Sequence, residues 1–219
     1  MRINYILPRS QANGPGHRYV VWVQGCSIHC PGCSNADTWD PQKGDEKPVN
    51  ELASDPFCGE GDVDGVTITG GEPLDQYEET LALCKAIIKE KQNIGPVATS
   101  FSIFLTTGYT LEQMQEKGFM EILDYLDILC VGPYNKDVQC SGQWKGSSNQ
   151  EIFFLTELGK KQSRMPVILT EYFVRPDGQT LKTGFTFNEQ PIDGLMSLMT
   201  WPRFIEHPKL DVCYCEAAS

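Results

Sequence analysis

"VDGVTITGGEPLDQYEETLALCKAII", residues 63–88, contains the pattern that decides the fold. It begins with a run of Val, Ile and Thr, which favours a β-strand, and this run stops at two glycines. Apolar side chains then return at helical spacing, at Leu74, Tyr77, Leu81, Cys84 and Ile88. The stretch therefore predicts a strand, a tight glycine turn and a helix, in that order.

The same order recurs downstream of this stretch, and a further strand precedes it. Downstream, residues 101–109 predict a strand that runs into a second glycine turn, residues 111–126 a helix and residues 127–132 another strand. Upstream, the strand expected at residues 19–24 ends just before a cysteine-rich loop. Alternating strands and helices are typical of α/β folds with a parallel sheet. Ligands of such sheets bind beyond the carboxyl ends of the strands, so the cysteine loop and both glycine turns are expected at one edge.

The remaining segments divide the chain into a core and an extension. Residues 41–62 and 134–150 are rich in charge, Gly and polar residues and are predicted to be long loops. Further on, an Arg-Pro-Asp-Gly turn between two β-like runs predicts a hairpin, and the last thirty residues show no period. We therefore expect a core at residues 1–155 and a C-terminal extension at residues 156–219, a hairpin plus an irregular tail, packed on the core.

Composition excludes several classes of partner. The 219 residues carry 18 Lys and Arg against 29 Asp and Glu, a formal charge of −11, whereas nucleic-acid binding requires clustered cations. The N-terminus has no apolar run of signal-peptide length, and no stretch approaches the roughly 20 apolar residues that cross a bilayer. These features predict a cytoplasmic protein with no nucleic-acid or membrane partner.

The cysteine-rich loop has metal-ligand spacing. Cys26, Cys30 and Cys33 follow the pattern C-x3-C-x2-C, and in a reducing compartment clustered thiols favour metal binding over disulfides. Three thiolates without a fourth nearby suit a cubane iron–sulfur cluster with one iron free, because a structural zinc site normally has four protein ligands. The zinc alternative stays open on spacing alone, and it needs a fourth ligand such as His29, Cys58, Cys140, Cys213 or Cys215.

The motifs together resemble those of a known superfamily. C-x3-C-x2-C is the signature of radical S-adenosylmethionine (SAM) enzymes. The longer string "GCSIHCPGCSNADTW", residues 25–39, resembles the cluster loop of anaerobic (class III) ribonucleotide reductase activating enzymes, and its end is similar to that of pyruvate formate-lyase activating enzymes. Four other segments resemble further motifs of these activases and occur in the same order: "NGPGHR" (13–18), "TGGEPL" (69–74), "TTGY" (106–109) and "WKGSSNQ" (144–150).

The resemblance implies a fold, two cofactors and their ligands. The fold would be a partial (β/α)6-type radical SAM barrel with the C-terminal extension added. Cys26, Cys30 and Cys33 would hold a [4Fe-4S] cluster, and SAM would chelate its fourth iron. Residues that the resemblance places at the cofactor are Gly70, Gly71, Glu72, Pro73, Thr107 and Tyr109.

The resemblance also implies a reaction and partners. Reductive cleavage of SAM would give a 5′-deoxyadenosyl radical, which would generate a glycyl radical on a partner enzyme. The electron would come from a flavodoxin or ferredoxin. The residues implied at the partner's entry are Asn13, Gly14, Pro15, Gly16, Arg18, Ser147, Ser148 and Asn149.

Each motif also has a purely structural interpretation, and the match has gaps. Gly-Gly-Glu-Pro suits a helix-initiating turn, Asn-Gly-Pro-Gly suits a β-turn, and residues 144–150 suit a helix cap. Val131 stands where these activases carry an acidic residue, and residues 156–219 are additional.

Two alternative functions therefore stay open. One is a radical SAM enzyme that modifies another protein, a peptide or a small molecule, and the other is a non-catalytic Cys-based metal-binding module.

Overall fold

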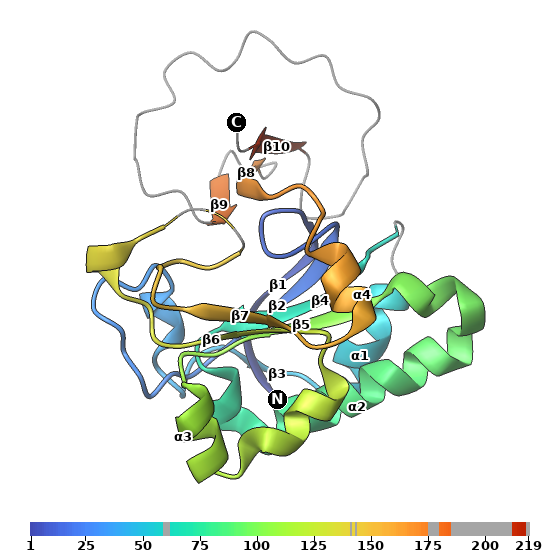
Figure 1. The fold of residues 1–219 in the computed structure, drawn as a ribbon, viewed down its shortest axis with the longest axis horizontal. Helices are drawn as coiled ribbons and strands as arrows, with labels where there is room; N and C mark the ends of the chain where they lie inside the picture. The colour runs from blue at the N-terminus through green and yellow to red at the C-terminus, as the bar shows by residue number, and fades with distance from the viewer. Residues whose placement is uncertain (59–61, 141, 143, 175–179, 185–211, 218–219) are drawn as a thin grey trace, which may run out of the picture.

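The computed structural model describes residues 1–58, 62–140, 142, 144–174, 180–184 and 212–217. A seven-stranded sheet lies at its centre (Figure 1), in the order β3-β1-β2-β4-β5-β6-β7. The four inner strands β2, β4, β5 and β6 are parallel, and the outer strands pair antiparallel. The predicted α/β fold with a largely parallel sheet is confirmed. In chain order the strands are β1 (Arg2–Ser10), β2 (Arg18–Val23), β3 (Asp45–Glu46), β4 (Gly65–Gly70), β5 (Ser102–Thr106), β6 (Ile128–Val131) and β7 (Glu151–Phe154).

The helices that cross between the parallel strands cover one face of this sheet (Figure 1). They are α1 (Val49–Cys58), α2 (Tyr77–Ile94) and α3 (Leu111–Glu116), whereas α4 (Glu157–Gln162) follows β7. Alternate residues of each strand face opposite sides: Val21 and Val23 pack in the core under the helices, whereas Val20 and Trp22 belong to a second apolar cluster on the other face.

Two segments have a different secondary structure from the one predicted. Residues 41–62, expected as a loop, contain α1, whose buried side chains include Leu52 and Ala53, so burial outweighs the charge and proline that suggested a loop. The helix expected at residues 111–126 is divided. Gly118 adopts a left-handed conformation (φ +78°), which ends α3 and begins the 3-10 helix η4 (Phe119–Tyr125).

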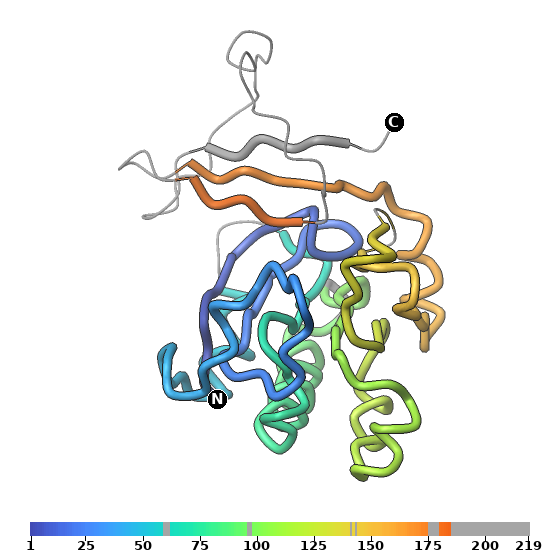
Figure 2. The backbone as a smooth tube through the Cα atoms, turned by 90° about the vertical axis from the view of Figure 1, so that its left-hand side faces the viewer, coloured from blue at the N-terminus to red at the C-terminus, as the bar shows by residue number. Residues whose placement is uncertain are grey.

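The C-terminal extension contributes a second, three-stranded sheet, in the order β10-β8-β9. β8 (Ile168–Val174) and β9 (Thr180–Gly184) form the predicted hairpin, whose turn lies outside the described residues. β10 (Val212–Ala217) pairs antiparallel with β8 and was not predicted. Figure 2 shows the hairpin, in orange, lying across the blue N-terminal strands and their connecting loop. Within the described parts of the chain, no helix is both long and apolar enough to span a membrane.

Candidate active site

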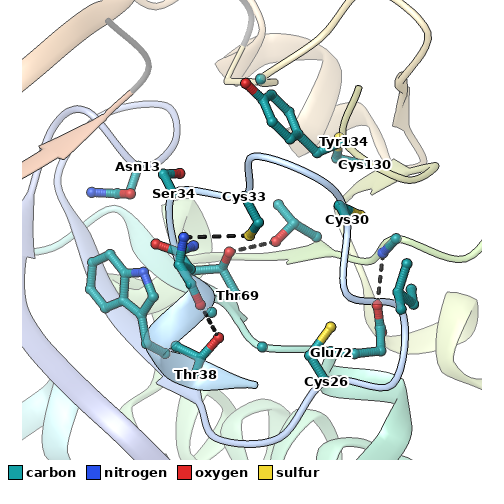
Figure 3. A pocket seen from close by; sticks show the side chains of 18 of the residues that line it. Asn13, Cys26, Cys30, Cys33, Ser34, Thr38, Thr69, Glu72, Cys130 and Tyr134 are labelled. Carbon is teal, nitrogen blue, oxygen red and sulfur yellow. Dashed lines mark hydrogen bonds between the residues drawn. The ribbon is translucent and has the colours of Figure 1, made fainter. Parts of the chain in front are cut away.

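A cavity of about 860 Å³ lies beyond the carboxyl ends of the parallel strands. Cys26, Cys30 and Cys33 all line it, together with the glycine turn after β4, the Thr107–Gly108 turn after β5 and Gly132 after β6. Figure 3 shows the three cysteines around this space, with Glu72 beside Cys26. The predicted meeting of the loop and both turns at one edge of the sheet is therefore confirmed.

The cysteine loop is closed at its base by backbone hydrogen bonds. The Gly25 amide donates to Thr38 O (2.7 Å), and the Cys26 amide donates to Trp39 O (3.2 Å). Above this closure the His29 ring stacks on Trp39, with 4.7 Å between ring centroids. This arrangement fits the interpretation of Trp39 as a packing residue beneath the loop. His29 is exposed and does not line the cavity.

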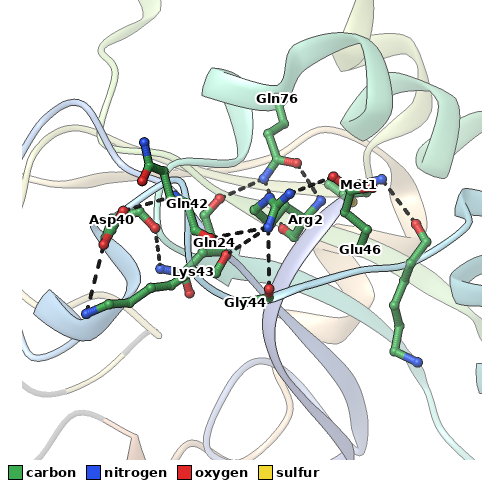
Figure 4. Close-up of polar contacts among 10 residues, drawn as sticks. Met1, Arg2, Gln24, Asp40, Gln42, Lys43, Gly44, Glu46 and Gln76 are labelled. Carbon is green, nitrogen blue, oxygen red and sulfur yellow. Dashed lines mark hydrogen bonds and ion pairs between the residues drawn. The ribbon is translucent and has the colours of Figure 1, made fainter.

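A polar network fastens the far end of the loop to the sheet (Figure 4). Gln24, the last residue before the loop, donates from its side chain to Asp37 O (3.2 Å) and Asp40 O (2.8 Å). Gln76 donates to Gln24 O (2.9 Å) and Arg2 O (3.0 Å) and accepts from the Arg2 amide (2.7 Å). These bonds tie the loop, β1 and the segment after the glycine turn into one unit.

The thiols are free and partly buried. Burial raises the pKa of Cys26, and backbone amides of His29 and Ile28 act against this rise. Burial likewise raises the pKa of Cys30, opposed by the backbone amide of Tyr134 from the loop after β6. The Asn35 amide donates to Cys33 Sγ (3.4 Å). Amides directed at sulfur are the contacts that stabilise thiolates and tune iron–sulfur clusters.

The donor set fits a cluster in which each thiolate binds a different iron. The three half-buried thiols come from one loop and line one cavity. In the described residues, no three His, Cys, Asp or Glu side chains form a group that could hold a metal ion. A cubane distributes its ligands over several irons, so its thiolates need not converge on one point. Of the residues named for zinc, Cys58 is exposed, Cys140 is half-buried, and the side chains of Cys213 and Cys215 lie outside the described parts.

Glu72 connects the two glycine turns. Its wholly buried carboxylate accepts from the Leu74 amide (2.9 Å), the Thr107 hydroxyl (2.7 Å) and the Gly108 amide (2.8 Å). Glu72 also caps the short helix η2 (Pro73–Gln76), which confirms the helix-initiating interpretation of this turn. The cofactor role and the cap role are compatible, because Oε1 accepts from Leu74 and Thr107, whereas Oε2 accepts from Gly108 and retains a lone pair for a further donor.

Glu72 gives the protein a distinctive pH dependence. Desolvation by burial raises the pKa of Glu72 to about 7 from its ordinary value of 4.5. Between these values the folded state holds a proton that the unfolded state has lost, so the contribution of Glu72 to stability is present below pH 4.5 and lost as pH rises through 7. We expect about 3 kcal/mol of unfolding free energy to disappear over this window.

The measurement is denaturant unfolding of the metal-free protein at several pH values, compared with Glu72→Gln. The variant should lack this negative slope, whereas Glu79→Gln, on the exposed side of α2, should retain it. Equal slopes in the wild type and Glu72→Gln would show that Glu72 is ionised in the folded state throughout.

Asp75 is a site residue that sequence reasoning missed. Its carboxylate accepts from the Ser27 amide (2.6 Å), the Ser27 hydroxyl (2.9 Å) and the Tyr109 hydroxyl (2.7 Å). Asp75 thereby joins the start of the cysteine loop to the turn after β5. Tyr109, expected to flank the cofactor, does not line the cavity; its ring is buried behind the loop. The sequence did offer one indication of this role. Asp75 follows Glu72 by three residues, so one turn of 3-10 helix brings it to the same edge of the sheet as Glu72.

Asp75→Asn is expected to loosen the cysteine loop, because an amide offers one acceptor oxygen where the carboxylate offers two. We expect the unfolding free energy to fall by about 1 kcal/mol. Resistance of the bound iron to a chelator should fall about tenfold, as for other partners that orient metal ligands. The control is Asp124→Asn, an exposed carboxylate in η4. Chelator resistance equal to that of the wild type would contradict the assignment.

The residues expected at the partner's entry are dispersed. Asn13 lines the cavity, whereas Gly14, Pro15 and Gly16 do not. Arg18 is wholly buried, and its guanidinium donates to Thr67, Ser102 and backbone carbonyls inside the fold, so the structure does not bring it to the cavity.

The 144–150 motif braces its own loop. Ser147 is buried and accepts from the Asn135 amide (3.1 Å), while Asn149 donates to Pro133 O (2.8 Å). The helix-cap interpretation of this motif is wrong, because strand β7 follows it. Ser148 and Asn149 are exposed, and Trp144 and Gly146 line the cavity instead of the three predicted residues.

Comparison with known proteins shows the family to which the chain belongs and the relatives that it resembles. Residues 12–153 match the family model described as "4Fe-4S single cluster domain". The anaerobic ribonucleoside-triphosphate reductase-activating protein of Enterobacteria phage T4 is 33% identical over 72% of this chain and 96% of its own length. The protein of the same name from Escherichia coli K12 is 29% identical over 71% of this chain and 99% of its own. A pyruvate formate-lyase-activating enzyme from Streptococcus mutans is 30% identical over 68% of this chain and 57% of its own.

The family match covers the cysteine loop and both turns. The chain belongs to the 4Fe-4S single-cluster family, in the group of radical SAM activating enzymes. The predicted cofactors, a [4Fe-4S] cluster and SAM, are confirmed at the level of the family.

Proposed function

We propose that this chain activates a glycyl radical enzyme of the anaerobic ribonucleotide reductase type. The observation that carries the proposal is the cavity itself, in which three thiols from one loop face the Gly70–Glu72 turn and the Thr107–Gly108 turn. The named relatives support the choice of partner. Cys26, Cys30 and Cys33 would hold a [4Fe-4S] cluster beside SAM, and together these cofactors would supply the one-electron cleavage chemistry needed to remove a hydrogen atom from a glycine of the partner.

The chain's own residues bind, orient and shield the reacting groups. Cys26, Cys30 and Cys33 would hold three irons. Backbone groups of Gly70 and Gly71 and the carboxylate of Glu72 would receive the amino group of SAM, since a carboxylate attracts an ammonium-like donor. Thr107 holds the Glu72 carboxylate in place. Pro73 is buried and begins η2, so its role would be to orient Glu72.

The fold supports this assignment at the level of its architecture. We infer that β2, β4, β5 and β6 with their crossover helices are a reduced form of the (β/α)6-type partial barrel, placed so that the cluster lies at the strands' carboxyl ends. Residues 1–155 would form this core and residues 156–219 the extension. We further propose a cytoplasmic location, a flavodoxin or ferredoxin as electron donor, and no nucleic-acid or membrane partner, in keeping with the charge of −11.

The test uses the anaerobically reconstituted protein, the anaerobic ribonucleotide reductase encoded in the same genome, SAM and a strong reductant. A glycyl radical signal on the reductase, seen by electron paramagnetic resonance, is the expected result. No radical in the presence of active SAM cleavage would contradict the proposed partner.

A second candidate is a radical SAM enzyme that modifies another protein, a peptide or a small molecule. Two departures from the pattern of the activases favour it. Val131, buried in the core, stands where they carry an acidic residue, and the additional C-terminal sheet brings β9 to the cavity wall. A product formed without any glycyl radical enzyme would support this candidate.

A further inference from the structure

The C-terminal hairpin forms part of the cavity wall. Leu181, Lys182, Thr183 and Gly184 of β9 line the same cavity as the three cysteines. These residues lie beyond position 153, where the family match ends. The additional sheet therefore adds a surface to the site that the matched part of the chain does not supply.

Glu171 of β8 holds the loop between β1 and β2. Its carboxylate, only 2% exposed, accepts from the Gln11 amide (2.8 Å), the Ala12 amide (3.0 Å) and the Ser10 hydroxyl. Both carboxylate oxygens serve as acceptors for this short segment. Because hydrogen bonds to a buried carboxylate are strong, the loop is fixed by the extension and not only by its own strands.

Asn13 and Thr183 join the loop to β9 directly at the cavity. The side-chain Nδ2 of Asn13 donates to the Thr183 hydroxyl (2.8 Å) and to the Ser10 hydroxyl (2.8 Å). Asn13 and Thr183 both line the cavity. The loop and the strand thus form one continuous polar wall, which includes the exposed Lys182.

Apolar packing fastens the hairpin independently of these polar contacts. Phe173 of β8 is buried with Leu7, Val20 and Trp22 on the outer face of β1 and β2, and Leu181 packs against the same cluster. Removing one polar contact should therefore change the position of the loop without detaching the hairpin.

We propose that the β8–β9 hairpin forms the wall along which the substrate segment enters, with Glu171 as a positioning residue that holds Asn13 in this wall. The proposal rests on the proposed function. The substrate class is an extended protein segment that carries the hydrogen atom to be removed. The lone pairs left on Asn13 Oδ1 and Thr183 Oγ1 can accept from peptide N–H groups, and the exposed Lys182 ammonium can donate to a peptide carbonyl.

The first experiment needs no partner. Hydrogen exchange of the purified protein should show protected amides at residues 11 and 12, and Glu171→Gln should accelerate their exchange, because an amide cannot accept from both backbone donors and the Ser10 hydroxyl. Thr180→Val is the matched control, since Thr180 lies on β9 but does not line the cavity. Unchanged exchange in Glu171→Gln would overturn its positioning role.

The second experiment measures the affinity of the reconstituted protein for the anaerobic ribonucleotide reductase from the same genome, and the KM and kcat of radical formation. Glu171→Gln and Thr183→Val should each weaken binding and raise KM about three- to tenfold, the effect of losing one or two hydrogen bonds. The kcat should change far less, and Thr180→Val should match the wild type.

The outcomes distinguish this inference from the proposed function. Unchanged affinity and KM in both variants, with normal radical formation, would overturn the hairpin's role and leave the function standing. A wild type that neither binds the reductase nor generates a radical on it would overturn both proposals, even where hydrogen exchange confirms the contact between Glu171 and the loop.

Discussion

Cys30→Ala is expected to abolish cluster binding and, with it, the cleavage of SAM. The three thiols line one cavity and come from one loop that hydrogen bonds hold closed, so losing one leaves two ligands for a cluster that needs three. Iron and sulfide per chain after anaerobic reconstitution should fall to background, and so should 5′-deoxyadenosine formed with SAM and reductant.

Cys130→Ala is the matched control for this prediction. Cys130 also lines the cavity, but it is buried in β6, and desolvation raises its pKa to about 12, which keeps the thiol protonated. This variant should load iron as the wild type does. A Cys30→Ala protein with normal iron content and normal 5′-deoxyadenosine formation would show that the cluster is held elsewhere.

Gly71→Ala is expected to cause a large loss of stability. A Cβ at Gly71 would collide with the backbone carbonyl of Gly25, the residue that leads into the cysteine loop, and would lie 3.1 Å from Val23 O. Backbone on both sides cannot move aside cheaply. We expect the unfolding free energy to fall by about 3 kcal/mol and cluster loading to fall with it.

Gly118→Ala is the control that separates a steric collision of the added Cβ from the cost of placing alanine in a left-handed conformation. Gly118 has a left-handed conformation and no atom near its potential Cβ, so only the conformational cost of about 1–2 kcal/mol applies. Denaturant unfolding of both metal-free variants, followed by iron analysis after reconstitution, makes the comparison. A Gly71→Ala variant as stable as Gly118→Ala, with full iron loading, would show that the turn and the loop separate easily.

The parallel part of the fold was predictable because its signals are local. Residues 63–88 carry a β-branched strand, two glycines and a helical period, and β4, η2 (Pro73–Gln76) and α2 follow that order. Other elements depend on tertiary contacts. β1 contains Pro8 and has little alternation, yet it pairs with both β2 and β3, and α1 contains Pro56 but buries Leu52 against α2 and its surroundings.

The parts of the site that were predictable are those in which the spacing of residues along the sequence itself indicates a ligand. The three cysteines and the Gly70–Glu72 turn were found from the sequence and share one cavity. Asp75 and Glu171 were missed, because a single carboxylate has no motif until the fold brings donors to it. Arg18 was expected at the partner's entry, but the pleat directs its side chain into the protein, where the guanidinium donates to Ser102 and backbone carbonyls.

SAM cleavage by the reconstituted wild-type protein tests whether the three cysteines hold a cluster with radical SAM activity. Purified protein would be loaded with iron and sulfide without oxygen and then given SAM and a strong reductant, and the products separated by chromatography. We expect 5′-deoxyadenosine and methionine in equal amounts, and neither product without iron. A fully loaded cluster that yields neither product, with or without the reductase, or a protein that takes up one zinc per chain in place of iron, would contradict this expectation.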